Sequence, residues 1–204
     1  EARIDGEPYV LYVNHFKTKR DGESDTDLAR IQQAVYLNGL AAERLAADPR
    51  AGLIALGDFN DTEASPALAL LTEAAQGGRL VNALRAIPDE QRYSYNFGGV
   101  SELIDGILLS PALAEEVSAA TVVHINTDFP VGWRLDISAE HLSYRATDHD
   151  APWLVLGRAP ATPTPAPTPV PTPTTVVRAN PTATDATPAT VPPTATTLAS
   201  TLSP

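Results

Sequence analysis

The feature that most constrains the fold is a sharp change of composition near residue 158. Residues 159–204 hold 12 of the chain's 19 Pro, with 14 Thr and 9 Ala, whereas the 158 residues before them hold only 7 Pro. A Pro/Thr-rich segment has too little apolar surface to offset the entropy of ordering, so we expect a disordered linker or stalk over residues 159–204. The folded domain must then form within residues 1–158.

Composition excludes several classes of protein. The chain has no Cys, which rules out disulfides, thiolate metal sites and a Cys nucleophile. Its net charge of −11 gives no broad basic surface, so any nucleic acid would have to be bound through metal ions and local Arg or Lys side chains. No apolar run approaches the roughly 18 residues that span a membrane. Since the chain also lacks Met and a signal peptide, we expect it to begin inside a longer protein.

Strand-like and helix-like segments alternate before the Pro/Thr-rich segment, which predicts an α/β or α+β fold with buried sheets. The longest expected helix has Ser24 as its N-cap and an apolar face formed by residues at three-and-four spacing, namely Leu28, Ile31, Val35, Ala42 and Leu45. The expected helices are Asp25–Ala47 and Pro66–Ala75, and the expected strands are Tyr9–Asn14, Leu53–Leu56, Tyr93–Phe97, Ile104–Leu109, Thr121–Ile125 and Trp153–Leu156.

Four short polar segments lie at the ends of these strands. They read Val-Asn-His-Phe-Lys (13–17), Gly-Asp-Phe-Asn-Asp (57–61), Leu-Ile-Asp-Gly (103–106) and Thr-Asp-His-Asp (147–150). Together they supply carboxylates, an amide and two imidazoles, which suit oxygen-ligand metals such as Mg²⁺, Mn²⁺ or Ca²⁺ and suit phosphoryl chemistry. In such chemistry a cation neutralises the phosphate, an acid or imidazole orients water, and an imidazole assists the leaving oxygen.

Taken singly, each segment also fits a structural role. Gly-Asp-Phe-Asn after a strand is often a turn, because Asp and Asn bond their own backbone. An Asp-His pair is more often a structural hydrogen bond than a catalytic pair, and His15 alone would fit a core histidine. Lys17 suits either contact with phosphate or a solvated loop, and Arg145 is a second candidate for phosphate contact. The combination of the four segments is what favours a site.

In their order along the chain, VNHFKTK, GDFND, IDGILLSP and TDHDAP resemble the C-terminal half of the endonuclease/exonuclease/phosphatase superfamily, which has the deoxyribonuclease-I-like fold. VVHINTDFP followed by YRATDHDAP resembles the bacterial extracellular nuclease branch of that superfamily. The resemblance spans roughly residues 7 to 157. It implies an α/β/β/α sandwich of two packed sheets, of which this chain would supply only part.

The resemblance also implies roles for individual residues. Asp58 matches the residue that positions or activates the attacking water, and Asn60 matches its amide partner. Asp148 matches a metal ligand. His149 matches the imidazole at the scissile phosphate, and Asp105 matches the carboxylate that fixes its tautomer.

His15 matches a second imidazole near the phosphate. His124 and Asn126 fall in the branch signature, where a structural hydrogen bond at a strand end is an equally good interpretation. The chain departs from the family pattern at Gly106, where His or Tyr is common. It also lacks a Gln-Glu pair, and the family's N-terminal half carries a Glu metal ligand in such a pair. We therefore expect the N-terminal half of the domain to be missing.

These observations predict a monomeric, divalent-metal-dependent phosphodiesterase. With Mg²⁺ as the expected cofactor, and Mn²⁺ or Ca²⁺ as alternatives, it would be an extracellular or cell-surface endonuclease acting on DNA or RNA. Its domain would be residues 1–158, and this fragment alone would be inactive. A phosphatase or phospholipid phosphodiesterase of the same fold is one alternative, and a non-catalytic surface-anchored binding module is another.

Overall fold

The computed structural model describes residues 1–130, 138 and 145–157 of the chain. The predicted linker at 159–204 lies outside the described residues, so its disorder stays a prediction. No helix in the described part of the chain is both long enough and apolar enough to pass through a membrane.

A five-stranded sheet forms the centre of the described domain, with the strand order β1-β2-β3-β7-β4. Its strands are β1 (Ala2–Ile4), β2 (Glu7–His15), β3 (Gly52–Asp58), β7 (Asp105–Leu109) and β4 (Val81–Asn82). Strand β2 runs parallel to β3, whereas β1 pairs with β2, and β7 with β3 and β4, in the antiparallel sense. A parallel pair needs a crossover connection, and the helix between β2 and β3 provides it.

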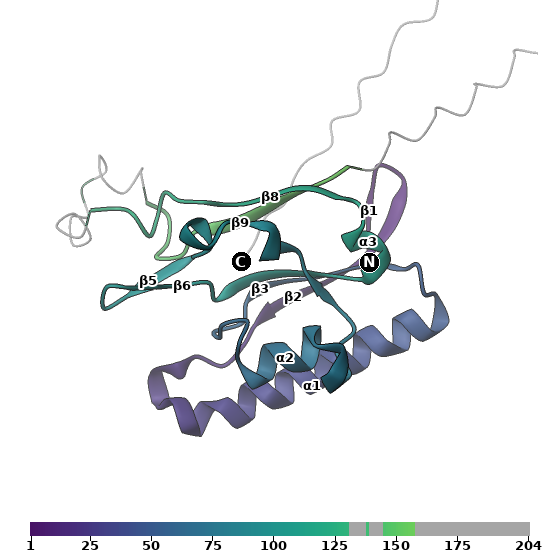
Figure 1. The fold of residues 1–204 in the computed structure, drawn as a ribbon, viewed down its shortest axis with the longest axis horizontal. Helices are drawn as coiled ribbons and strands as arrows, with labels where there is room; N and C mark the ends of the chain where they lie inside the picture. Colours follow the sequence, from purple (N-terminus) through teal and green to yellow (C-terminus); the bar gives the residue numbers. More distant parts are fainter. Residues whose placement is uncertain (131–137, 139–144, 158–204) are drawn as a thin grey trace, which may run out of the picture. The chain divides into compact units, whose positions relative to one another are not determined.

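Helices α1 (Glu23–Ala47) and α2 (Pro66–Thr72) cover one face of this sheet (Figure 1). Helix α2 begins where the Ser65 side chain accepts a hydrogen bond from the Leu68 amide, with Pro66 in the first turn. Apolar side chains of both helices and of β3 and β7 form the main core, including Ala34, Leu37, Leu53, Leu71 and Leu108.

The expected apolar face of the long helix is only partly right. Ile31 and Leu45 pack against the core, but Leu28 and Val35 are exposed, and the fully buried positions are Arg30, Ala34 and Ala41. Small Ala side chains let the helix approach the sheet closely, and this packing outweighs the simple count of large apolar residues. The expected N-cap is also wrong, because Ser24 lies inside the helix and Gly22 is the N-cap.

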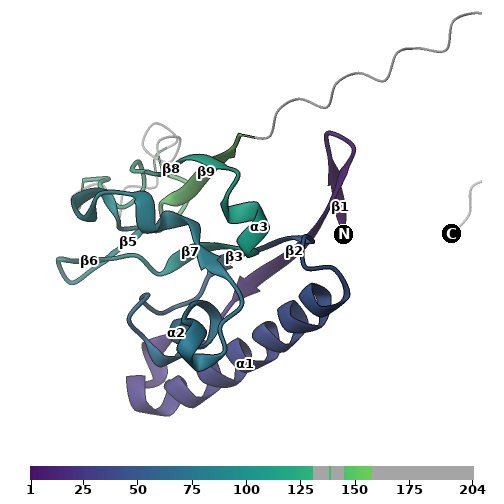
Figure 2. The same ribbon diagram turned by 45° about the vertical axis from the view of Figure 1, so that its right-hand side comes forward.

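The other face of the sheet packs against a two-stranded ribbon of β8 (Val117–Val123) and β9 (Ala151–Leu156) and against α3 (Pro111–Ala114). A second ribbon, β5 (Tyr95–Phe97) with β6 (Val100–Glu102), leads directly into β7 (Figure 2). Short 3₁₀ helices span Lys19–Asp21, Ala74–Gln76, Ala83–Ala86 and Asp89–Gln91. The predicted strand Tyr93–Phe97 ends as expected but begins only at Tyr95. The predicted strand Thr121–Ile125 lies further back, at Val117–Val123, and the predicted helix Pro66–Ala75 ends at Thr72.

The strand register brings three of the four polar segments to one end of the sheet. His15 pairs with Asp58 at the ends of β2 and β3, and Asp58 pairs with Asp105 at the start of β7. Parallel strands end on the same edge, and an antiparallel neighbour begins there. The fold therefore lines up His15, Asp58 and Asp105 across three adjacent strands.

Gly57 allows β3 to approach β2 closely just before Asp58. Its φ is 127°, and a Cβ atom at this position would lie 2.1 Å from the Asn14 carbonyl oxygen. A side chain is therefore excluded both by backbone conformation and by contact with the neighbouring strand.

We predict that Gly57→Ala lowers the free energy of unfolding by roughly 1–3 kcal/mol, the usual cost of forcing a residue into a disfavoured backbone conformation. Gly39→Ala is the matched control, since Gly39 is inside α1 with open space around its Cβ position. It should leave stability unchanged or raise it by up to about 1 kcal/mol. Denaturant unfolding of both variants measures this, and equal stability of the two would contradict the close approach.

Candidate active site

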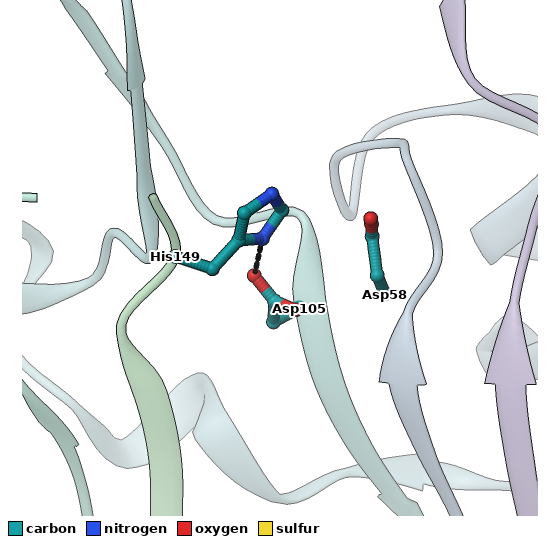
Figure 3. Close-up of side chains that lie close together, drawn as sticks. All are labelled: Asp58, Asp105 and His149. Atoms are coloured by element: carbon teal, nitrogen blue, oxygen red, sulfur yellow. Dashed lines mark hydrogen bonds and ion pairs between the residues drawn. The ribbon is translucent and has the colours of Figure 1, made fainter. Parts of the chain in front are cut away.

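Asp58, Asp105 and His149 converge from three segments that are far apart in the sequence (Figure 3). One side-chain ligand atom from each lies within 4.8 Å of the others. Asp58 comes from the end of β3, Asp105 from the start of β7, and His149 from the segment that precedes β9. We refer to Asp58, Asp105 and His149 as the row. The backbone of His149 is held beside it by an isolated antiparallel bridge to the backbone of Tyr95.

The His149 ring is fixed by the Asp105 carboxylate. His149 Nδ1 lies 2.7 Å from Asp105 Oδ2. Because a carboxylate can only accept, Nδ1 carries the proton and Nε2 is left facing away from Asp105. The Tyr95 ring packs against the imidazole, with 4.7 Å between ring centroids. This arrangement matches the tautomer-fixing role that the sequence resemblance implies for Asp105.

Ser94 is a residue of this site that the sequence reasoning missed. Its fully buried hydroxyl donates to Asp105 Oδ2 over 2.7 Å and accepts from the backbone amides of Ile104 and Asp105. Its carbonyl accepts from the Asp150 amide over 2.7 Å. Ser94 thus ties the Asp105 strand to the His149 segment. No sequence signal marks it, because Ser94 fits the aromatic–polar alternation of residues 93–97 as an ordinary solvent-facing position would.

Asp58 and Asn60 form a second fixed pair. Asp58 Oδ1 accepts from the Asn60 amide over 2.7 Å, and Asp58 Oδ2 accepts from Asn60 Nδ2 over 3.0 Å. Asn60 also donates to the Phe16 carbonyl and has a left-handed backbone with φ of 49°, which Asn tolerates better than most residues. His15 Nε2 lies 3.5 Å from Asp58 Oδ2, with 76% of its side chain exposed. His15 is therefore not a core histidine.

The remaining predicted site residues are less closely tied to this row. Asp148 is exposed and precedes His149 directly, and its charge helps to raise the pKa of His149. The Lys17 amide donates to Gln33, and its carbonyl accepts from Arg30, so the backbone here is fixed while the side chain is half-buried. Among the contacts of the described residues, none joins Arg145 to Asp58 or His149.

A buried carboxylate next to His149 holds the neighbouring loop. Asp150 Oδ1 accepts from the backbone amides of Ile125, Asn126 and Thr127, and Oδ2 accepts from the Thr127 hydroxyl and from His124 Nδ1 at 3.0 Å. Burial alone would raise the pKa of Asp150, but the bonds from Thr127, His124 and the backbone hold it below its usual value.

Asn126, whose backbone amide donates to Asp150, also holds the backbone of His149. Its Nδ2 donates to the His149 carbonyl over 2.7 Å, and its Oδ1 accepts from the Ala146 amide over 3.1 Å. His124 Nε2 faces the Gln91 carbonyl, and its ring stacks on Tyr93. The signature residues His124 and Asn126 thus make structural hydrogen bonds, the alternative that the sequence left open for them.

Arg30 is a further residue that the sequence reasoning did not single out. Its fully buried guanidinium donates to Asp61 Oδ2 over 2.9 Å, to Thr26 and to the Lys17 carbonyl. Lys19 pairs with the other Asp61 oxygen at 3.0 Å. Losing one partner of a buried ion pair typically costs about 3–5 kcal/mol. Arg30 therefore links α1 firmly to the two loops that follow β2 and β3.

The electrostatics of the row shift two pKa values in the same direction. Burial raises the pKa of Asp58, and the Asp105 charge adds to this, while the Asn60 amide and the two imidazoles oppose it. The Asp105 hydrogen bond raises the pKa of His149 against the effect of its burial, and the charges of Asp105, Asp58 and Asp148 add to the shift. Asp58 becomes a better proton acceptor, and His149 holds its proton to a higher pH.

The donor atoms present fit a divalent cation. Asp58 and Asp105 offer carboxylate oxygens in the row, and the exposed Asp148 offers another directly before His149. Hard cations such as Mg²⁺ and Ca²⁺ prefer oxygen ligands. His149 Nδ1 already donates to Asp105, so this nitrogen is not available as a ligand of the cation. We expect the carboxylates, rather than the imidazole, to hold the metal.

Comparison with known proteins assigns the family. A model described as the Endonuclease/Exonuclease/phosphatase family matches residues 1–129. The chain belongs to this family, and the predicted mixed α/β fold class is confirmed. The matched region includes His15, Asp58, Asn60 and Asp105 and ends before Asp148 and His149.

No curated protein matches the chain. Among solved structures, the crystal structure of truncated Caenorhabditis elegans TDP2 is 16% identical, with a TM-score of 0.43. That similarity covers 55% of this chain and 44% of the TDP2 chain, so the matched region spans less than half of that structure.

We predict that NMR titration of His149 gives a pKa above the ordinary 6.5, and that Asp105→Asn lowers it by removing the carboxylate partner. A raised folded-state pKa means that this pair stabilises the fold fully below pH 6.5 and loses its contribution as the pH rises through the folded value. Asp89→Asn, at an exposed carboxylate, is the control. A His149 pKa that does not respond to Asp105→Asn would contradict the pairing.

Proposed function

We propose that the chain is the C-terminal part of a divalent-metal-dependent phosphodiesterase, an extracellular endonuclease acting on DNA or RNA. The observation that supports this most strongly is the row of Asp58, Asp105 and His149, with Asn60 bonded to Asp58. It combines a partly buried proton acceptor, an imidazole oriented by a carboxylate, and several carboxylate oxygens that could bind a cation. The family membership of the chain supports the same class of reaction.

In this proposal each residue of the row has a distinct task. Asp58 accepts a proton from the attacking water, whose oxygen forms the new bond to phosphorus while the bond to the leaving oxygen breaks. Asn60 keeps the Asp58 carboxylate in place through its two hydrogen bonds. His149, protonated and held at Nδ1 by Asp105, presents Nε2–H to a phosphate oxygen.

Asp148, together with the Asp105 carboxylate, would hold the cation, for which we propose Mg²⁺, while Asp58 serves as the proton acceptor. When bound, a divalent cation supplies charge neutralisation at the phosphate and polarises the P–O bonds. The net charge of −11 makes this necessary, because an acidic domain would otherwise repel a polyanionic substrate. Lys17 and Arg145 remain the proposed phosphate contacts outside the row.

We also propose that a further segment of the same domain covers the part of the sheet at the end of β2, on the face opposite the helices, that β8, β9 and α3 leave exposed. Leu11 and Val13 lie on the same face as the buried Tyr9, yet their exposed fractions are 38% and 78%. Within the described residues, β1 pairs with β2 only from Glu7 to Tyr9, so the rest of that edge lacks a strand neighbour. An uncovered apolar face beside an open edge fits a sandwich whose other half is supplied by another segment.

The extracellular or cell-surface location, the monomeric state and the stalk at 159–204 belong to the same proposal. They are supported by the Pro/Thr-rich composition of residues 159–204 and by the HINTD and YRATDHDAP stretches that resemble the bacterial extracellular nuclease branch.

The activity test uses a polypeptide that contains this chain together with the segment that precedes it. We predict plasmid nicking that requires Mg²⁺, and we expect His149→Ala or Asp58→Asn to lower turnover about 10²- to 10⁴-fold, the usual share of acid–base groups. Asp5→Asn, at the turn between β1 and β2, is the matched control and should keep full turnover. Release of phosphate from small monoesters without nicking would favour a phosphatase instead. Metal binding without any hydrolysis would favour a binding module.

We predict that the isolated 204-residue chain shows no Mg²⁺-stimulated cleavage, because the family's Glu metal ligand has no counterpart in it. Plasmid nicking by the purified chain, with His149→Ala as the blank, measures this. Robust cleavage that His149→Ala abolishes would contradict the proposal of a missing half while leaving the assignment of the row intact.

A further inference from the structure

The β5–β6 ribbon carries an exposed apolar face next to the candidate active site. Phe97 pairs with Val100 across the ribbon, and their exposed fractions are 72% and 61%. Directly opposed residues share a face, so Tyr95, Phe97 and Val100 lie together on one side. The opposite side is polar, with Asn96 donating to the Ser101 hydroxyl. Exposed large apolar side chains gathered on one face of a small ribbon mark a contact surface rather than core.

The rings of this face form a row that starts at His149. Tyr95 packs against the imidazole with 4.7 Å between centroids, and Phe97 follows at 6.4 Å from Tyr95 with an angle of only 10° between ring planes. Strands β5 and β6 project beyond the start of β7, where Asp105 lies (Figure 2). The row therefore leads from the proposed phosphate position outward along the ribbon.

The ribbon is also shaped to hold its rings in place without a ligand. Its turn consists of Gly98 and Gly99, both with positive φ (61° and 87°), which is the backbone of the tight two-residue turns that match strand twist. This turn sets the register in which Phe97 lies opposite Val100 and Tyr95 opposite Glu102. A preformed flat aromatic surface is what a planar ligand requires.

We propose that Tyr95 and Phe97 form a stacking surface for an unpaired nucleobase of the substrate, attached to the phosphate at the Asp58–Asp105–His149 row. This inference rests on the proposed nuclease function and narrows its substrate to nucleic acid with an accessible single-stranded base. Every base has a flat π face, so such a surface accepts any base and discriminates against paired ones.

A membrane surface fits the ribbon less well. Membrane-inserting ribbons place their large side chains at the tip, whereas here the tip is Gly98–Gly99 and the rings lie along one face. Glu102 pairs with Tyr95 on that same face, and a carboxylate there opposes insertion into lipid. Tyr95 packs against the His149 imidazole, so a base joined to a phosphate at His149 would lie within reach of the Tyr95 ring.

The test measures binding, so that it is independent of turnover. Fluorescence anisotropy with the 204-residue chain, Mg²⁺ and a labelled single-stranded DNA hexamer should show binding, with weaker binding of an abasic hexamer of equal charge. Phe97→Ala should weaken hexamer binding about tenfold, the usual value of one base–aromatic stack, and should remove the preference over the abasic strand. Phe97→Tyr, which keeps the ring, should restore both.

Asn96→Ala, on the polar face of the same ribbon, is the matched control and should bind the hexamer as the unaltered chain does. Equal binding of the hexamer by Phe97→Ala and the unaltered chain would overturn the inference, as would equal binding of hexamer and abasic strand or no binding of either. Sedimentation with phosphatidylcholine vesicles that depends on Phe97 would also overturn it, in favour of a lipid surface. Hexamer binding that depends on Phe97, together with no Mg²⁺-dependent nicking by the longer polypeptide, is the separate outcome that would remove the proposed function itself.

Discussion

The hydrogen bond between Asp105 and His149 is the interaction on which the rest of the site depends. It joins the central sheet to the segment before β9, and it decides which imidazole nitrogen carries the proton. Ser94 makes this bond rigid, since the Ser94 hydroxyl donates to the same Asp105 oxygen while its carbonyl holds the Asp150 amide. Ser94 thus couples the two segments, through its hydroxyl on the Asp105 side and its backbone carbonyl on the Asp150 side. Asp58 is placed beside Asp105 by strand register.

Two buried charges hold the loops around this bond. Asp150 satisfies three backbone amides and two side chains, so the cost of burying its carboxylate is offset by its hydrogen bonds. The buried guanidinium of Arg30, on α1, likewise donates hydrogen bonds to Asp61, Thr26 and the Lys17 carbonyl, which offset the cost of its burial. Both networks tie loop backbone to secondary structure, which keeps the site residues preorganised.

The sequence predicted the parts of the site that follow from strand ends and missed those that follow from packing. His15, Asp58 and Asp105 stand at strand termini, where a parallel pair and an antiparallel neighbour must bring them together. Ser94 and Arg30 act through burial, and nothing local in the sequence shows that a serine or an arginine will be fully enclosed. The α1 face was misjudged for the same reason, because Ala34 and Ala41 are buried by close packing that a count of large side chains does not reveal.

The ring row of Tyr95 and Phe97 was also hidden, because alternation in YSYNF fits a core strand as well as an exposed one.

The mechanism depends on a divalent cation held by the carboxylates beside His149. The most direct measurement is a Mn²⁺ titration of the 204-residue chain, followed by paramagnetic broadening of its NMR resonances. Broadening should centre on residues 58, 105, 148 and 149 and leave the β1–β2 turn unaffected. Broadening centred elsewhere, or none at the row, would contradict it.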